Sequence, residues 1–328
     1  MCTRALWSPS PDTVLTGRTM DYEVDLATNL WAFPRGMQRD GCVDDSLTWT
    51  SRYGSVVAAA YDQASADGLN EAGLAGHLLW LAESDYGERD PERPALSAAV
   101  WVQYMLDNFA TVAEAVDWMR SSRVQVRTSG DPGTGRAVTV HLALDDSTGD
   151  SAIVEYIDGE PHIWHDRAYT VMTNSPPFAE QLERLREIRG FGGERPLPGG
   201  SDADERFART AYYLDRLPGP DDRTLAVAEM LSVIRNASQP FRVADPDQPN
   251  ASTTLWRTVA DHSEGVYVYE STRRPNIVWV RLDHLDLSEG APARRLDLVA
   301  DTGLEGGLTG EVSGRFEAHE PMEFLHAT

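Results

Sequence analysis

Short apolar runs separated by turn-forming residues dominate the beginning of the chain. Apolar and β-branched residues bounded by Gly, Pro, Asp or Ser are typical of strands. We therefore predict strands over residues 2–7, 14–20, 46–52, 55–61 and 73–81. The segment Ser8-Pro9-Ser10-Pro11-Asp12 would join the first two strands as a hairpin, because proline cannot continue a ladder. The polar stretch 62–70 is interpreted as a separator between strands.

The spacing of apolar residues changes to three or four between positions 96 and 120, which predicts helices. Thr111 followed by Glu114 forms a capping-box pattern, so a second helix is expected to begin there. The Gly-containing segment 128–136 is predicted to be a loop. Further helices are predicted over residues 178–189, 203–217 and 225–236, and further strands over 138–144, 152–157, 169–173, 253–260, 265–271 and 276–282.

The order of these elements indicates an α+β protein. Two blocks of helices stand between blocks of strands that are connected as antiparallel neighbours, which favours sheets covered by helices over alternating βαβ units. No internal repeat or linker interrupts the chain, so we expect one domain over residues 1–328.

Composition narrows the classes of function. The formal net charge of −23 makes nucleic acid and anionic membrane surfaces poor partners. The sequence contains no lysine, which excludes a Schiff-base lysine, a Ser-Lys catalytic pair and a phosphate-loop lysine. The hydrophobic fraction of 41% is ordinary for a globular core.

The sequence has no apolar run long enough to cross a membrane, which takes about 18 residues, and no leader-like segment at its start. We therefore expect a cytoplasmic protein without membrane contact; a signal peptide trimmed from the sequence would make it periplasmic or secreted. Cys2 and Cys42 are the two cysteines, and both are interpreted as free thiols.

Cys2 is the first candidate for chemistry. A small residue after Met1 permits removal of the methionine, which would leave a thiol and a free α-amine on one residue. The amine has a reference pKa of about 7.7–8.0 and the thiol about 8.5, so the amine can accept the thiol proton near neutral pH. The alternative interpretation is an incidental small residue at a frayed end.

The predicted hairpin places charged residues near Cys2. If Trp7 pairs near Val14, Cys2 lies opposite Arg18 or Thr19, and Asp21 is one diagonal step away. A neighbouring cation would favour the thiolate, and a carboxylate would orient the amine. A plain salt bridge between Arg18 and Asp21 at a strand end remains the alternative.

Several further motifs are distributed over nearly the whole chain: Cys2-Thr3-Arg4, Gly17-Arg18-Thr19-Met20-Asp21, Asp67-Gly68-Leu69-Asn70-Glu71-Ala72-Gly73-Leu74, Met172-Thr173-Asn174-Ser175-Pro176, Leu197-Pro198-Gly199-Gly200 and Glu205-Arg206-Phe207. Together and in this order they resemble the motifs of one known family, the choloylglycine hydrolases, which include penicillin V acylases and bile salt hydrolases.

This resemblance implies an αββα four-layer sandwich of the N-terminal-nucleophile type, often a homotetramer. It implies cleavage of small linear acyl amides through a thioester acyl-enzyme, without a cofactor or a metal. It also assigns roles: Cys2 is nucleophile and base after loss of Met1, Arg18 and Asp21 hold the thiol and the amine, Asn174 donates its amide to the oxyanion, and Arg206 completes the polar site.

Two of these residues also have ordinary structural interpretations. Asn174 precedes two prolines and could form an Asx turn, whereas a positioned oxyanion donor is worth roughly 10²–10³ in rate. Arg206 lies near the start of a predicted helix after Ser201, which we interpret as its cap, and could be a solvated charge on the helix face.

Trp80 departs from the pattern of bile salt hydrolases, which resemble one another in having Asn at the matching position. The resemblance implies that the backbone N–H there is a second oxyanion donor, while the indole would occupy space near the acyl group. Penicillin V and acyl-homoserine lactones would then be better substrates than conjugated bile salts. A core aromatic is the alternative interpretation of Trp80.

Competing functions are less well supported by the residues. A metal site at His162 and His165, with His141 and Asp166 nearby, is disfavoured because alternating strand residues face opposite sides and no His-Glu-x-x-His helix exists. A Gly-x-Ser-x-Gly elbow is missing as well. A binding protein that keeps the fold without turnover remains the non-enzymatic alternative, although its polar set would be expected to be broken.

Overall fold

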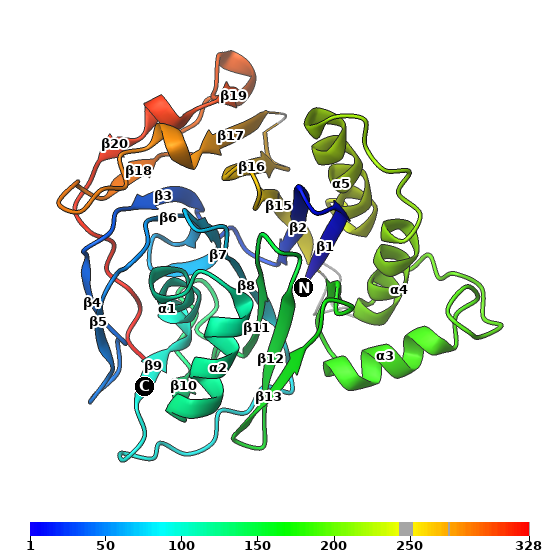
Figure 1. Ribbon diagram of the computed structural model, residues 1–328, viewed down its shortest axis with the longest axis horizontal. Coiled ribbons are helices and arrows are strands. Elements are labelled where there is room, and N and C mark those ends of the chain that lie inside the picture. The colour runs from blue at the N-terminus through cyan, green and yellow to red at the C-terminus, as the bar shows by residue number, and fades with distance from the viewer. Residues whose placement is uncertain (243–251, 275, 328) are drawn as a thin grey trace.

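The computed structural model describes residues 1–242, 252–274 and 276–327, so Thr328, at the end of the predicted domain, lies outside the described residues. Two sheets lie face to face in the centre of the molecule (Figure 1). The larger elements described below form four layers; two short pairs stand apart from the main sheets, β4 (Gln38–Asp40) with β5 (Thr48–Thr50) and β9 (Ala95–Ser97) with β10 (Gln125–Arg127).

The seven-stranded sheet holds the chain start. Its order is β14-β1-β2-β15-β16-β17-β19, which brings the N-terminal hairpin between strands from much later in the chain. The strands are β14 (Val171–Met172), β1 (Cys2–Ser10), β2 (Thr13–Tyr22), β15 (Thr253–Asp261), β16 (Val266–Ser271), β17 (Ile277–Arg281) and β19 (Gly310–Glu311).

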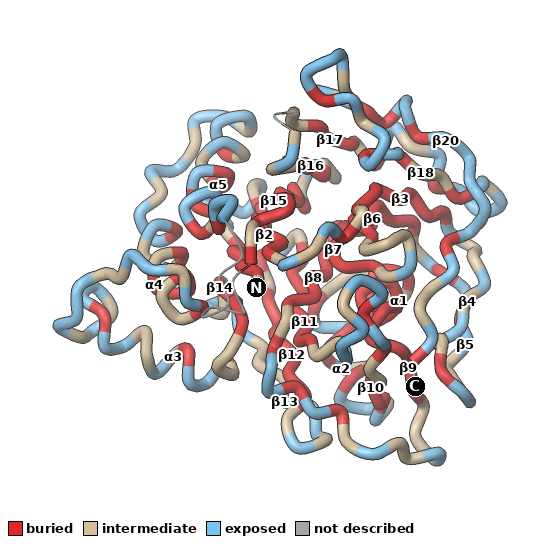
Figure 2. Tube along the Cα trace, turned by 180° about the vertical axis from the view of Figure 1, so that it is seen from behind, coloured by how far each residue is buried: buried red, intermediate tan, exposed pale blue. Residues whose placement is uncertain are grey.

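The nine-stranded sheet has the order β13-β12-β11-β8-β7-β6-β3-β18-β20. Its strands are β13 (Glu160–His165), β12 (Ser151–Ile157), β11 (Val140–Asp145), β8 (Ala75–Trp80), β7 (Ala64–Asn70), β6 (Ser55–Ala60), β3 (Asn29–Phe33), β18 (Arg294–Leu296) and β20 (Glu317–Ala318). The central strands of both sheets are buried along most of their length (Figure 2).

Helices cover the outer face of each sheet. Helices α1 (Trp101–Asn108) and α2 (Val112–Ser122) pack on the nine-stranded sheet, while α4 (Ala203–Leu214) and α5 (Arg223–Ala237) pack on β1, β2 and β15 (Figure 1). Helix α3 (Phe178–Arg186) packs on α4. Short 3₁₀ turns occur at Ala98–Val100, Leu282–His284, Gly303–Glu305 and Ser313–Arg315. This arrangement confirms the predicted αββα sandwich.

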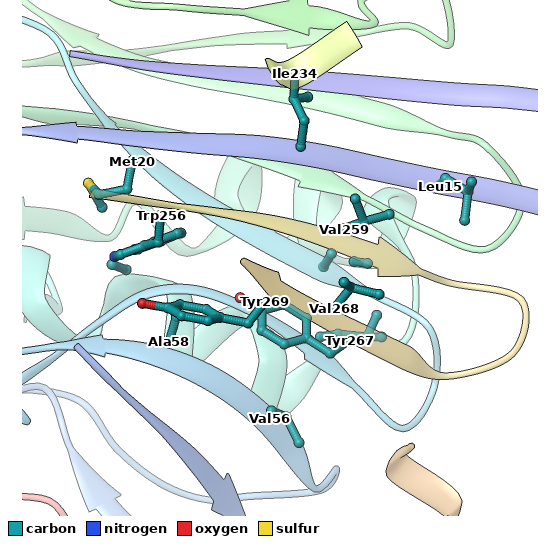
Figure 3. Close-up of a cluster of buried hydrophobic side chains, with 14 of the residues drawn as sticks. Leu15, Met20, Val56, Ala58, Ile234, Trp256, Val259, Tyr267, Val268 and Tyr269 are labelled. Atoms are coloured by element: carbon teal, nitrogen blue, oxygen red, sulfur yellow. The ribbon is translucent and has the colours of Figure 1, made fainter. Parts of the chain in front are cut away.

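Aromatic side chains fill much of the space between the sheets. Figure 3 shows Tyr267 and Tyr269 of β16 facing Val56 and Ala58 of β6, with Trp256 of β15 beside them. Burial of large aromatic side chains is a major source of stabilisation, at about 25 cal/mol per Å² of apolar surface removed from water. This packing holds the two sheets at a fixed separation.

Several sequence predictions require correction. The stretch 62–70 is not a separator: most of it is strand β7, buried on both faces and therefore lacking a clear polar and apolar alternation. The strand predicted over 46–52 shortens to β5, and β3 and β13 were not predicted. The start of α2 is confirmed, because the Thr111 side chain accepts a hydrogen bond from the Glu114 N–H.

Within the described ranges, the chain contains no helix that is both long and apolar enough to cross a membrane.

Candidate active site

The N-terminal hairpin brings Cys2 and Arg18 to the same face of the seven-stranded sheet. Cys2 lies opposite Met20, and Arg18 is the diagonal neighbour, with its Nη2 3.8 Å from the Cys2 Sγ. The predicted register, with Cys2 opposite Arg18 or Thr19, is therefore wrong. A bulge between Trp7 and Ser10 pairs Trp7 with Leu15 and shifts the register, which the sequence did not reveal.

Arg18 is fully buried and held on several sides. Its Nη1 lies 3.1 Å from Asp67 Oδ2 and also donates to the Ala66 carbonyl, while Nη2 donates to the Leu78 carbonyl. Burial opposes the charge, but the Cys2 thiol and Asp67 outweigh it and raise the pKa of Arg18. The guanidinium is therefore a permanent cation beside the sulfur.

Asn174 and Arg206 enclose the backbone of Cys2 from the other side. The Cys2 N–H donates to Asn174 Oδ1 at 2.6 Å, and Arg206 donates to the same oxygen through Nη2 at 2.8 Å. Arg206 Nη1 also donates to the Cys2 carbonyl at 2.5 Å. Arg206 comes from α4, whose cap is Asp202 in a capping box with Glu205, rather than Ser201 as the sequence suggested.

Asp21 lies on the opposite face of β2 from Arg18. Its Oδ1 accepts a 2.6 Å hydrogen bond from Thr254 Oγ1, and its Oδ2 lies 3.9 Å from Arg206 Nη1. The Met1 ammonium donates to the Asp21 backbone carbonyl at 2.5 Å. Burial lowers the pKa of this ammonium below its usual value, although the neighbouring Cys2 and Asp21 raise it. Burial in this part of the site therefore disfavours the charged form of an amine.

The amide of Asn174 links Cys2 to Trp80. Asn174 Nδ2 donates to the Trp80 carbonyl at 2.7 Å, and a primary amide nitrogen carries a second N–H that can donate elsewhere. Trp80 is the last residue of β8, and its half-buried ring lies 5.6 Å below the Arg136 guanidinium. Residues from both sheets and from α4 thus meet around one thiol.

Two cavities meet at this point. The first, here called the inner pocket, has a volume of about 110 Å³ and is mainly apolar, with Cys2 in its wall and a lining that includes Leu26, Tyr61, Leu78, Val138, Val140 and Leu325. The second, here called the outer basin, has a volume of about 680 Å³ and includes Asn174, Arg136 and several carboxylates. Met1, Tyr22 and Trp80 line both cavities.

A buried polar cluster behind Arg18 was missed by sequence reasoning. Asp67 Oδ2 is 2.5 Å from His77 Nδ1, and Asp67 Oδ1 accepts hydrogen bonds from Thr258 and Tyr267. Although burial opposes ionisation, His77 and Arg18 hold the pKa of Asp67 below its usual value. The available signal is Asp67 among small and apolar residues, but the polar residues around it favour a connection over a strand in the sequence.

Cys42 lies outside the site. It occupies the left-handed region with φ of 52°, and burial together with Asp40 raises the pKa of its thiol to about 12. Such a thiol is a poor nucleophile at neutral pH. Both cysteines are free thiols, as expected.

Comparison with known proteins gives a consistent result. Residues 2–300 match the model of the linear amide C–N hydrolases, choloylglycine hydrolase family. The chain is 42% identical to a penicillin V acylase of Pectobacterium atrosepticum, with 98% of this chain and 92% of that protein covered.

Solved structures agree with that match. The penicillin V acylase from Agrobacterium tumefaciens superposes with a TM-score of 0.88 at 44% identity, covering 99% of both chains. A conjugated bile acid hydrolase from Clostridium perfringens shares the fold, with a TM-score of 0.76 at 20% identity over 90% of this chain and 96% of that one.

Proposed function

The chain belongs to the choloylglycine hydrolase family of linear amide C–N hydrolases, and we propose that it cleaves acyl amides of the penicillin V type with Cys2 as the nucleophile. The single observation that carries this proposal is the environment of Cys2. Its sulfur lies 3.8 Å from a buried guanidinium, and its backbone nitrogen is held at 2.6 Å by Asn174.

Before the enzyme can react, Met1 is removed, which turns the Cys2 nitrogen from an amide into an α-amine. That amine accepts the thiol proton, and the positive charge of Arg18 stabilises the thiolate. Asn174 Oδ1 orients the amine, and Asp21 compensates the charge of Arg206 nearby.

The sulfur then attacks the carbonyl carbon of the substrate, forming an S–C bond and an oxyanion. The second Asn174 Nδ2 hydrogen and the Trp80 backbone N–H serve as its donors. The C–N bond breaks as the α-ammonium returns its proton to the leaving nitrogen, which leaves a thioester. Water, deprotonated by the same amine, hydrolyses the thioester and regenerates the thiol.

The two cavities divide the substrate between them. The inner pocket receives the acyl group because it is mainly apolar and Cys2 lies in its wall. It measures about 110 Å³ with Met1 in place, and loss of Met1 would enlarge it towards the roughly 150 Å³ at which an apolar cavity holds a benzene ring. A phenoxy ring or an alkyl chain fits that scale, whereas a steroid does not. The outer basin receives the leaving amine.

One observation favours acyl-homoserine lactones as a second substrate class. The outer basin contains four carboxylates, Glu23, Glu83, Asp202 and Asp204, against the two cations Arg136 and Arg184. This excess of negative charge repels an anionic leaving group and leaves a neutral lactone unaffected. Raising the salt concentration should therefore increase kcat/KM for penicillin V more than for a lactone amide.

The test compares kcat/KM for penicillin V, a long-chain acyl-homoserine lactone and glycocholate, on the wild type and on Trp80→Asn. We expect the wild type to prefer the first two by roughly 10–200-fold and Trp80→Asn to narrow that gap. Cys2→Ala should be inactive and Cys42→Ala fully active.

Other outcomes select the alternatives. A wild type that prefers glycocholate would be a bile salt hydrolase, and one that binds these amides without turnover would be a ligand-binding protein. The homotetramer and the cytoplasmic location remain expectations, which size-exclusion chromatography with light scattering and cell fractionation would test.

A further inference from the structure

A pair of buried side chains lies directly behind the segment that carries Asn174. This segment, residues 173–177, connects β14 to α3. His141 Nε2 contacts the Thr173 carbonyl at 3.0 Å, at the start of the segment. Glu155 accepts the N–H of Phe178, at its end, with distances of 2.9 Å to Oε1 and 3.2 Å to Oε2. One side chain of the pair therefore contacts each end of the segment.

The same two side chains also contact each other. His141 lies on β11 and Glu155 on the adjacent strand β12, and His141 Nδ1 is 3.2 Å from Glu155 Oε1. Their exposed fractions are 2% and 1%, so water does not compete for these contacts. Neither residue appears in the lining of the inner pocket or the outer basin.

The hydrogen-bond inventory requires an extra proton in this pair. The Thr173 carbonyl only accepts, so His141 Nε2 must carry hydrogen, and a neutral imidazole then has a bare Nδ1. A carboxylate also only accepts. The contact between Nδ1 and Glu155 is therefore a hydrogen bond only when one proton is held between the two groups. The N–H groups at the start of α3 favour placing the negative charge on Glu155.

Asn174 is also held by a residue of α3, the helix whose first N–H contacts Glu155. Gln181, on the first turns of α3, donates through Nε2 to the Asn174 carbonyl at 3.1 Å. Gln181 therefore fixes the backbone of Asn174, while the Asn174 side chain contacts Cys2, Arg206 and Trp80. A shift of about 1 Å in such a group can cost on the order of 100-fold in rate.

The geometry points to His141 and Glu155 as positioning residues that share one proton and hold the Asn174 amide at the distance needed by the Cys2 amine and the oxyanion. This inference rests on the proposed role of Asn174. According to this inference, His141 and Glu155 contribute measurably to the rate although neither residue touches the substrate.

The experiment measures kcat and KM with penicillin V on Glu155→Leu, His141→Leu and Glu155→Gln. We expect both leucine variants to lose roughly 10–100-fold in kcat with KM within about threefold. The reason is that a displaced Asn174 serves the Cys2 amine and the oxyanion less well, whereas neither interaction contributes to binding of the intact substrate. Glu155→Gln should stay within about threefold of the wild type, because its amide donates to a neutral His141 and its oxygen still accepts from Phe178.

A double-mutant cycle with Asn174→Ala separates positioning from general damage. If the pair acts through Asn174, adding Glu155→Leu to Asn174→Ala should cause little further loss. Asp107→Asn is the matched control: Asp107 is another buried carboxylate, bound to Trp49 and Gln103 on the far side of the nine-stranded sheet. It should lower stability without lowering kcat.

Each result decides the question. Additive losses in the cycle, or a Glu155→Gln variant as slow as Glu155→Leu, would overturn the positioning role. If Glu155→Leu has the kcat of the wild type while Asn174→Ala is impaired, the positioning role is overturned and the proposed function stands. If Asn174→Ala is fully active, the proposed role of Asn174, on which this inference rests, is wrong. If the leucine variants do not fold, Glu155→Asp, which withdraws the carboxylate from one partner, should show the same kcat loss; normal kcat there contradicts the inference.

Discussion

The two faces of strand β7 differ in the charge and packing of their side chains, although neighbouring residues form them. Asp67 points between the sheets, where its carboxylate binds Arg18 and His77. Gly68 points to the outer face, where a Cβ would lie 2.9 Å from Leu106 of α1. One face carries buried charge behind the thiol. The other packs under a helix without charge, mainly through apolar contacts, and its neutral polar residues Ser65 and Asn70 hydrogen-bond to α1.

This difference shows why the charges behind the thiol are paired with one another. An isolated buried ion costs several kcal/mol unless it is paired, so charges in a core need a compensating arrangement. Arg18 and Asp67 are such a pair, and Arg4 and Asp145 form a second one nearby, with His77 between the two carboxylates. The layer under α1 has no comparable role in placing the thiol.

The largest effect should follow from breaking the polar face. Asp67→Ala removes the partner of a fully buried cation, so we expect a loss of about 3–5 kcal/mol in the free energy of unfolding. Turnover should also fall, because Arg18 loses the contact that aims it at Cys2. Urea denaturation measures the stability, and kcat on the folded protein measures the turnover. A variant with the kcat of the wild type would show that Asp67 is not needed to position Arg18 for catalysis.

The matched truncation on the apolar face should affect stability alone. Leu106→Ala leaves a cavity in the layer between α1 and the nine-stranded sheet and should cost about 2–5 kcal/mol. We expect kcat per folded molecule to equal that of the wild type, measured below the unfolding transition. A kcat loss as large as that of Asp67→Ala would show that the two faces do not differ in function.

Acid should weaken the buried polar face through His262, which directly follows β15. Its Nε2 lies 2.8 Å from the Thr16 hydroxyl, and that hydroxyl donates to Asp145. Burial lowers the pKa of His262 to about 4 from 6.5, so the unfolded chain takes up a proton before the folded one does. This contribution is present above pH 6.5 and is lost as the pH falls towards 4, by on the order of 3 kcal/mol. Chemical denaturation from pH 7 to 4 should show a shallower decline in His262→Gln; equal slopes would contradict the assignment.

The smallest effect in this series is expected at Gly68. A Cβ there would lie 2.6 Å from the Val57 Cγ1 and 2.7 Å from the Val56 carbonyl, so Gly68→Ala overpacks the sheet. We expect a loss of about 1–3 kcal/mol and an unchanged kcat. Thermal unfolding checks the first expectation, and a KM or kcat change would show that strain on this face reaches the site.

The same strand explains what the sequence could and could not predict. The hairpin, the helices and the residues around Cys2 were predictable, because turn residues, helical spacing and ordered motifs are local signals. Strand β7 was not, since a strand covered on both sides lacks alternation. The exact pairing of Cys2 depended on a bulge, and the partners of Arg18 depended on contacts between the two sheets.

The central claim is that Cys2, freed of Met1, carries the acyl group during turnover. Intact-mass and N-terminal peptide analysis of enzyme quenched in acid during hydrolysis of penicillin V tests it directly. We predict a chain that lacks Met1 and carries a phenoxyacetyl group on Cys2, and no such adduct in Cys2→Ala. A fully active protein that retains Met1, or an acyl group on any other residue, would contradict the account.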